Sequence, residues 1–246
     1  MLKIYTTDLH IHSCLSPCGD LDMSPRNIVA TAVEKQLDII AITDHNASEN
    51  ILATMKAAQG KSLTVLPGME VTSEEEAHLI ALFDHFDSME QFQQIVYENL
   101  MTFGIDQRTI DDQVIVNEKD EVEGFNDHLL FGATALSFQQ LVEEVHRLNG
   151  LAIASHVDRE SYSIIAQLGF IPDDLRLDAL EISPKMSKQE ARTVFPEVNR
   201  FPLIKNSDAH YPGDIGGQRT KFLIQEPTTN EIKLALINSQ GRKVLE

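Results

Sequence analysis

Histidine and carboxylate side chains recur beside short apolar runs along this chain, and this pattern constrains both its fold and its chemistry. Six of its nine histidines belong to five such clusters. Neutral imidazole and carboxylate are the ligands that Zn, Mn and Fe prefer, so a dense set of them predicts more than one bound ion. A lone histidine beside an apolar strand is usually structural, but five repeats of the pairing favour a metal site. The clusters are His10-Ile-His12, Asp44-His45, Glu70 to His78, Ser155-His156 and Asp208-Ala-His210.

Apolar β-rich runs alternate with helical patterns, which is typical of a parallel α/β architecture. Ser24 followed by Pro25 predicts the start of one helix. Ser137 with Gln140 predicts a capping box at the start of a second, and a third is expected over residues 230–239. The expected strands cover residues 3–6, 38–43, 63–66, 79–83, 151–154, 179–182, 202–205 and 222–225.

The clusters fall where a strand–helix barrel places its active site, at the C-terminal ends of the strands. His78 is the exception because it precedes its strand, so a distorted barrel is expected. The length of 246 residues suits one barrel domain over residues 1–246. The acidic stretch 102–136 interrupts the strand–helix rhythm, and it is either an active-site lid or a disordered surface insertion.

The net charge of −18 disfavours polyanionic partners. Acidic surfaces repel phosphate backbones and anionic lipids, so a long nucleic acid is not an expected partner. No apolar run approaches the roughly 20 residues that span a bilayer, and the N-terminus has no pattern of a cleaved leader. The two cysteines, Cys14 and Cys18, do not form a disulfide pattern. These features predict a cytoplasmic protein with no membrane partner.

The first and last clusters share an alternating spacing. His10 and His12 flank an apolar residue, and the period of two in an extended chain puts both imidazoles on one side. Asp208 and His210 repeat this spacing near the end of the chain. Each pair therefore predicts two ligands that point the same way.

The middle clusters add a carboxylate that can bridge ions. His45 is the better candidate ligand of its pair, with Asp44 as the carboxylate that supports it. Glu70 has two oxygens and can contact two cations, and Gly68 lets the backbone approach closely. The acidic run 74–76 is more typical of a solvated surface.

These motifs together resemble the polymerase and histidinol phosphatase (PHP) superfamily of metal-dependent phosphoesterases. The resemblance is carried by DLHIHS, AITDHN, PGMEVT with a later histidine, ASHVDR and NSDAH, in the family's order. It implies a distorted (β/α)7 barrel and a trinuclear centre holding two or three divalent ions of Mn, Fe or Zn. The ligands it implies are His10, His12, His45, Glu70, His78, His156, Asp208 and His210.

One ligand of the family has no direct match. In many relatives an Asp or His lies five or six residues after the second histidine of the first motif, where this chain has Pro17 and Cys18. Either the Cys18 thiolate takes this place, or Asp20, two residues further on, does so. A thiolate would favour Zn or Fe over Mn.

The resemblance implies a hydrolase of phosphoric esters. Small phosphomonoesters, such as a nucleotide or a sugar or amino-alcohol phosphate like histidinol phosphate, are the expected substrates because the chain is acidic. The cations would bind phosphate oxygens and hold a water as hydroxide, so no protein nucleophile is required. Arg159 could clamp the phosphate or form an ordinary ion pair, and Asp44 could protonate the leaving oxygen.

Two other functions stay open. A phosphodiesterase or exonuclease for short oligonucleotides would be expected to have a basic track, which the sequence does not display. A metal-dependent hydrolase like the amidohydrolases would share the first and last motifs, but the additional Glu70 and His78 argue against it.

Overall fold

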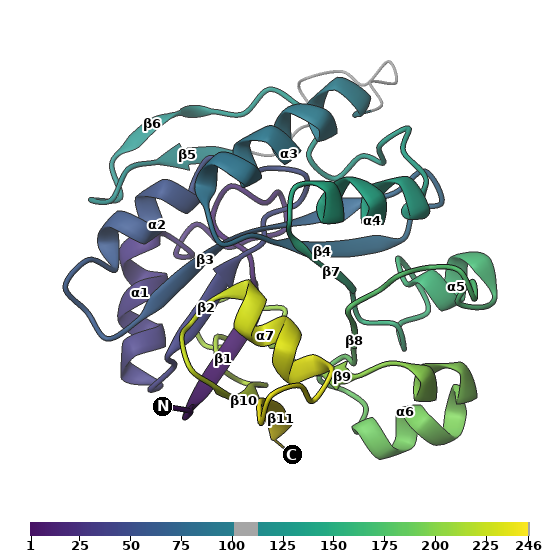
Figure 1. The fold of residues 1–246 in the computed structure, drawn as a ribbon. Helices are drawn as coiled ribbons and strands as arrows, with labels where there is room; N and C mark the ends of the chain where they lie inside the picture. The colour runs from purple at the N-terminus through teal and green to yellow at the C-terminus, as the bar shows by residue number, and fades with distance from the viewer. Residues whose placement is uncertain (101–112, 246) are drawn as a thin grey trace.

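A curled mixed sheet is the main feature of this computed structural model, which describes residues 1–100 and 113–245 (Figure 1). In the described chain the strand order of the sheet is β11-β10-β1-β2-β3-β4-β7-β8-β9. The strands are β1 (Lys3–Ile11), β2 (Ile39–Ile42), β3 (Thr64–Thr72), β4 (His78–Leu82), β7 (Leu151–Ala154), β8 (Ala179–Glu181), β9 (Leu203–Ile204), β10 (Thr220–Ile224) and β11 (Lys243–Leu245).

The chain that follows the last strand of the curl, β9, returns to β1. Ala209, beyond β9, forms a parallel bridge with Ile11 at the end of β1. The His12 N–H donates to the Ala209 carbonyl at 3.0 Å, and the Ala209 N–H donates to the His10 carbonyl at 3.3 Å. The segment after β9 therefore joins the first strand and brings the last sequence motif beside the first one.

Strand direction departs from a regular barrel. β4 runs antiparallel to both β3 and β7, and β10 runs antiparallel to β1. The expectation of an α/β fold with a distorted sheet is confirmed, but a uniform series of seven parallel units is not what the strands form. The reversal explains His78, because a reversed strand begins at the edge where its neighbours end.

Each predicted strand is present, and the helix signals are also confirmed. Ser24 precedes a helix that begins at Pro25, and Ser137 and Gln140 form the expected capping box. None of the helices in the described ranges has the length and hydrophobicity that a membrane span requires. The helices are α1 (Pro25–Glu34), α2 (Ile51–Ala57), α3 (Phe86–Asn99), α4 (Phe138–Arg147), α5 (Ile164–Leu168), α6 (Lys188–Val194) and α7 (Thr229–Leu236), with a 3-10 helix at Pro196–Arg200.

Alternating side chains divide the core into two parts. In β2, Ile40 and Ile42 belong to the outer core beneath the flanking helices, whereas Ile39 and Ala41 face an inner core that includes Ile232 of α7. Helix α7 lies near the beginnings of the parallel strands β7 and β8. This position is shown by the ion pair between Lys233 of α7 and Asp178, which lies just before β8. The opposite edge is left for polar side chains.

The stretch predicted as a lid or disordered insertion is folded where the structure describes it. Residues 101–112 lie outside the described residues. After them, β5 (Val114–Val116) and β6 (Val122–Phe125) form a two-stranded hairpin. The Asn50 side chain donates to the Val114 carbonyl and accepts from the Val116 N–H, both at 3.0 Å. The hairpin is thus attached to the loop that precedes α2.

Asp178 joins α4, β7 and α7 at the edge of the sheet opposite the polar side chains. One carboxylate oxygen accepts from the Ala152 N–H at 2.9 Å and lies 2.8 Å from His146 Nε2, while the other lies 2.9 Å from Lys233 Nζ. Burial alone would raise the pKa of Asp178, but the hydrogen bonds from His146, Ala152 and Lys233 hold it below its usual value.

Asp178→Asn is expected to lower the free energy of unfolding near pH 7 by about 1–3 kcal/mol, since a buried charged acceptor is lost. A carboxylate whose folded-state pKa is lowered stabilises the fold above its unfolded-state pKa of about 3.9. This contribution disappears as the pH falls through the folded-state value. Urea unfolding of the metal-free protein should therefore give a smaller difference at about pH 3 than at pH 7.

Asp173→Asn is the matched control, because the Asp173 side chain is 96% exposed. It should change stability by less than about 0.5 kcal/mol. An equal loss for Asp178→Asn at both pH values would contradict the charged role of this carboxylate.

Candidate metal centre

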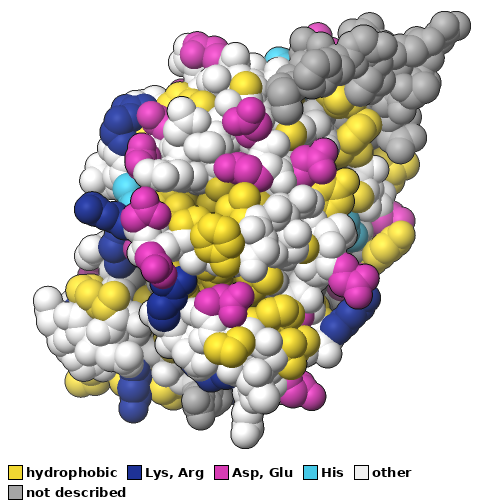
Figure 2. Space-filling model, turned by 90° about the vertical axis from the view of Figure 1, so that its right-hand side faces the viewer, with side chains coloured by type: hydrophobic (Ala, Val, Ile, Leu, Met, Phe, Trp, Pro, Cys, Tyr) yellow, Lys and Arg dark blue, Asp and Glu magenta, His cyan; other side chains and the backbone are white. Residues whose placement is uncertain are grey.

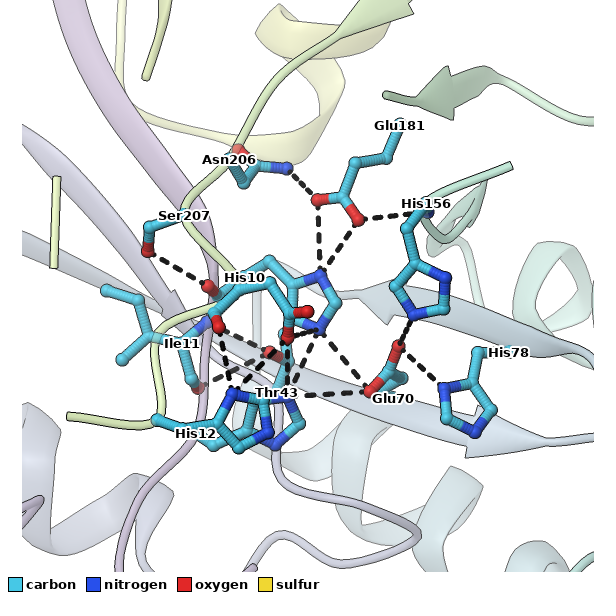
Figure 3. A network of polar contacts seen from close by, with 12 residues as sticks. His10, Ile11, His12, Thr43, Glu70, His78, His156, Glu181, Asn206 and Ser207 are labelled. Carbon is cyan, nitrogen blue, oxygen red and sulfur yellow. Dashed lines mark hydrogen bonds and ion pairs between the residues drawn. The ribbon is translucent and has the colours of Figure 1, made fainter. Parts of the chain in front are cut away.

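Glu70 lies at the middle of a group of histidines (Figure 3). Its side chain, on β3, is 1% exposed. One carboxylate oxygen, Oε1, lies 3.0 Å from His78 Nδ1 and 3.2 Å from His156 Nε2. His78 reaches this position from the reversed strand β4, directly across from Thr72 on β3. This side of Glu70 therefore faces two imidazoles from two further strands.

The other oxygen, Oε2, faces three more imidazoles. It lies 3.2 Å from His45 Nδ1 and 3.4 Å from Nε2 of both His10 and His12. Asp208 Oδ1 approaches the same two Nε2 atoms at 3.3 and 3.2 Å. The two oxygens of Glu70 thus divide the cluster into two sets of nitrogen ligands.

A third set lies on the outer side of His12 and His45. Its candidate ligand atoms, including Cys18 Sγ and a His210 nitrogen, all lie within 4.8 Å of one another. Asp20 belongs to none of the candidate metal groups among the described residues, and its Oδ1 instead accepts from the Asp22 N–H at 2.8 Å. Of the two alternatives for the ninth ligand, Cys18 is the one that lies with the histidines.

The arrangement of ring nitrogens fits a bound cation. His10 Nδ1 lies 3.0 Å from a Glu181 oxygen, and His12 Nδ1 lies 3.0 Å from Ser16 Oγ. The Ser16 hydroxyl donates to Asp44, so Nδ1 of His12 carries the proton of that pair. The two Nε2 atoms then face each other at 3.2 Å. Their lone pairs would repel unless a cation or a proton lay between them.

Further buried atoms in the cluster have no hydrogen-bond partner. Among the described residues these are His45 Nδ1, His78 Nδ1, His156 Nδ1 and Glu70 Oε1. Ligands about 2.0–2.2 Å from one tetrahedral ion lie roughly 3.3–3.6 Å apart, close to the spacing of the atoms around Glu70. The spacing of these atoms and their lack of hydrogen bonds therefore suit ligands of divalent ions better than a network of hydrogen bonds.

Burial sets the protonation of the imidazoles. It lowers the pKa of His12 to about 4 and that of His45 well below its usual value, which keeps both neutral and able to bind a metal. Burial would also lower the pKa of His10, but the surrounding carboxylates, with Glu181 foremost, raise it well above its usual value. A cation bound at His10 would take the place of that proton.

Glu181 is the functional candidate that the sequence interpretation missed. It ends β8, is 1% exposed, and accepts from Asn206 Nδ2 at 2.7 Å and from the His156 N–H at 3.1 Å. Its carboxylate orients His10 so that Nε2 points into the cluster, as outer carboxylates do for metal-binding histidines. The signal was present in the sequence, because a charged carboxylate interrupts the apolar strand predicted over residues 179–182.

Asp44 points away from the cluster. Its oxygens accept from the Ser13 N–H at 2.7 Å and from the hydroxyls of Ser13 and Ser16 at 2.6 Å. Asp8 holds Ser207 in the same way, with its N–H at 2.9 Å and its hydroxyl at 2.6 Å. Both carboxylates therefore fix loops that carry the histidine motifs.

The backbone is unusual at two of the candidate ligands. His156 has a φ of 27° and Asp208 a φ of 52°, both in the left-handed region that non-glycine residues seldom occupy. Such conformations occur often where a fold holds functional side chains. At Gly68, a β carbon would lie 3.0 Å from the Ile42 carbonyl oxygen, so glycine permits the close approach of β2 and β3 near Glu70.

Arg159 forms an ion pair with Asp208. Its side chain is 40% exposed and lines a hollow of about 620 Å³ together with Lys185. Of the two roles that the sequence left open for Arg159, the ion pair is formed, and the guanidinium also remains accessible at the edge of the cluster.

The chain is similar in sequence to a known protein family and to a longer bacterial protein. A family model described as the PHP domain matches residues 8–171. The uncharacterized protein YqxK of Bacillus subtilis is 24% identical over 276 aligned positions, which cover all of this chain and 65% of YqxK. The chain therefore spans less than two thirds of this relative.

Solved structures share the fold. The lesion-specific endonuclease PfuEndoQ from Pyrococcus furiosus aligns with a TM-score of 0.71 and 19% identity, over 98% of this chain and 58% of the endonuclease chain. A proposed metal-dependent phosphoesterase from Bifidobacterium adolescentis aligns with a TM-score of 0.59 and 16% identity, over 94% of this chain and 95% of that protein.

Glu181→Gln is expected to weaken binding of divalent metal by about 10–100-fold, because the charged partner that orients His10 and makes it more basic is lost. Competition with a chromogenic chelator for Zn would measure the affinity. Glu190→Gln is the control, since Glu190 belongs to the capping box of α6 and lies away from the cluster. Equal affinities in the two variants would show that Glu181 does not support the metal ligands.

Proposed function

The chain belongs to the PHP domain family, and on this premise we propose that it is a metal-dependent phosphoesterase whose preferred substrates are small phosphomonoesters. The observation that carries this proposal is the position of Glu70. Both of its buried oxygens face imidazole nitrogens at 3.0–3.4 Å, and Oε1 has no hydrogen bond. A carboxylate in that position suits the bridge between two cations.

We propose that the centre holds two or three divalent ions. Three overlapping groups of ligands support this number, because each offers at least three donors and they share only Glu70, His12 and His45. The groups are His10, His12, Glu70 and Asp208; His45, Glu70 and His78; and His12, Cys18, His45 and His210. His156 would complete the second group, since its Nε2 lies 3.2 Å from Glu70 Oε1.

Bound ions would supply positive charge for phosphate oxygens and would activate a water. The protein residues position the ester around them. Arg159 pairs with Asp208 at the edge of the cluster, where its charge can bind the nonbridging oxygens of a phosphate, and Lys185 lines the same hollow as Arg159. Asp44 is engaged by Ser13 and Ser16, so its proposed role is to position His12 through Ser16 rather than to donate a proton.

The charge distribution supports a small substrate. The chain has a net charge of −18. On the face shown in Figure 2, Lys and Arg side chains lie in separate small groups with Asp and Glu side chains between them, rather than in one basic track. A long polyanion would meet repulsion away from the metal centre.

Cleavage of DNA phosphodiesters is the second candidate function. It is favoured by the fold that this chain shares with the lesion-specific endonuclease PfuEndoQ. The chain spans 58% of that endonuclease, so the activity of the longer protein need not transfer.

Wild-type protein loaded with Mn, Fe or Zn is expected to release phosphate from a nucleoside monophosphate faster than it cleaves a single-stranded oligonucleotide. Asp208→Asn should reduce turnover by at least about 100-fold, because it weakens a ligand in the first group. Asp173→Asn, at an exposed site, is the control. Phosphate release and bound metal should be measured in the same samples.

Two results would contradict this account. Absence of phosphate release from all monoesters in a metal-replete sample would reject the phosphomonoesterase. Faster cleavage of the oligonucleotide at low salt, with a steep fall as salt rises, would favour the endonuclease instead.

Cys18 is the proposed ninth ligand. Protein loaded with Co²⁺ is expected to absorb in the near ultraviolet through sulfur-to-cobalt charge transfer, and Cys18→Asp should remove this band while Co²⁺ still binds. Cys14→Ala is the control, because Cys14 is buried against Val114 and Val116 away from the histidines. A band that survives in Cys18→Asp would exclude the thiolate as a ligand.

A further inference from the structure

A cavity of about 240 Å³ opens directly beside the metal cluster. Two of its walls are His45 and His78, which both contact Glu70. Phe131 and Tyr162, together with Pro17, form the apolar part of its lining. A group that enters this cavity would therefore lie next to an ester bound at the cluster.

The two aromatic side chains of the cavity are about half exposed. Phe131 is 50% exposed and Tyr162 is 45% exposed. Two large rings that remain in water beside a polar cluster can gain free energy by stacking against a ligand. Because both rings line the cavity, an organic group of the ligand that enters it would contact them.

The Tyr162 ring is held in a fixed orientation. It stacks on the His78 ring with 4.7 Å between centroids and 22° between planes. The Tyr162 carbonyl accepts the His78 N–H at 2.9 Å, and the Tyr162 φ of 57° lies in the left-handed region. A ring held in this way loses little conformational entropy when a planar ligand stacks on it.

Thr72 supplies a polar group inside the same cavity. It is 2% exposed, and its Oγ1 has no hydrogen-bond partner in the part of the chain that the structure describes. Its backbone groups are already used, since the N–H donates to Asn46 and the carbonyl accepts from Thr134. Buried hydroxyls are nearly always hydrogen bonded, so this one can pair with the polar edge of a ligand once the side chains that cover it shift.

We propose that this cavity binds a planar heteroaromatic ring, so that the preferred phosphomonoester is a nucleotide. The ring would stack on Phe131 and Tyr162 and would meet the Thr72 hydroxyl at its edge, while the phosphate lies at the Glu70 cluster. The cavity is smaller than the roughly 300–1,000 Å³ of sites for drug-sized ligands, which suits one ring system. This inference rests on the proposed phosphoesterase function and narrows its substrate class.

The test compares two esters that differ only in the ring, adenosine 5′-monophosphate and ribose 5-phosphate. Wild-type protein should have a kcat/KM for the nucleotide about 5–150-fold higher, the range that stacking of a base on aromatic side chains gives. Phe131→Leu should reduce this ratio at least about threefold, mainly through KM for the nucleotide. Phe170→Leu is the matched control, because Phe170 is 59% exposed and does not line the cavity.

Binding of both compounds should also be measured by calorimetry in the same metal-loaded protein. Tighter binding of the nucleotide, weakened by Phe131→Leu, would support the ring site even if neither ester were hydrolysed, in which case only the proposed function would fail. Equal kcat/KM and equal affinity for the two esters would overturn the inference. So would a Phe131→Leu variant that loses activity equally toward both.

Discussion

Burial of the Glu70 carboxylate is the constraint on which the arrangement of the site depends. A carboxylate that is 1% exposed needs strong compensation, because removing its charge from water is costly. Burial alone would raise the pKa of Glu70, but His78 and His10 hold it well below its usual value, so the charge remains. Imidazoles surround both oxygens, and cations bound among them would balance that charge. The reversed strand β4 and the bridge between Ile11 and Ala209 bring these imidazoles to one place.

Two carboxylates behind the candidate ligands hold the histidine side chains in place. Glu181 fixes His10 directly, and Asp44 fixes His12 through Ser16. Because Glu181 ends β8 and Asp44 follows β2, the sheet positions the ligands and their supports together. Besides the metal ligands, the proposed reaction needs only groups that hold the phosphate and the organic part of the ester. Arg159 can bind phosphate oxygens at the rim, and the cavity beside His78 can take the organic part of the ester.

The positions of the strands and most of the cluster followed from local sequence patterns. Apolar runs predicted the strands because side chains buried on both faces leave a continuous signal. The position of His78 before its strand indicated a distortion, and the antiparallel β4 explains it. Glu181 was missed because the interpretation followed histidines, although its charged carboxylate interrupts a predicted apolar strand.

Other features depend on contacts that no local pattern encodes. The hairpin of β5 and β6 buries Val114 and Val116 against Cys14 and is held by Asn50, both from a distant part of the chain. The choice between Cys18 and Asp20 depends on the loop around Gly19, where a β carbon would lie 2.3 Å from the Ser13 carbonyl oxygen. Only a glycine permits this turn, and the turn brings Cys18 toward His12 while Asp20 faces another way.

The central claim is that Glu70 bridges metal ions held by the surrounding histidines. Anomalous diffraction from crystals grown with Zn or Mn, recorded on both sides of the metal's absorption edge, tests it most directly. The account predicts at least two anomalous peaks, one within bonding distance of each Glu70 oxygen, with His10 and His12 at one and His78 and His156 at the other. Metal-replete crystals with no peak beside Glu70, or with one peak that contacts neither oxygen, would contradict the account.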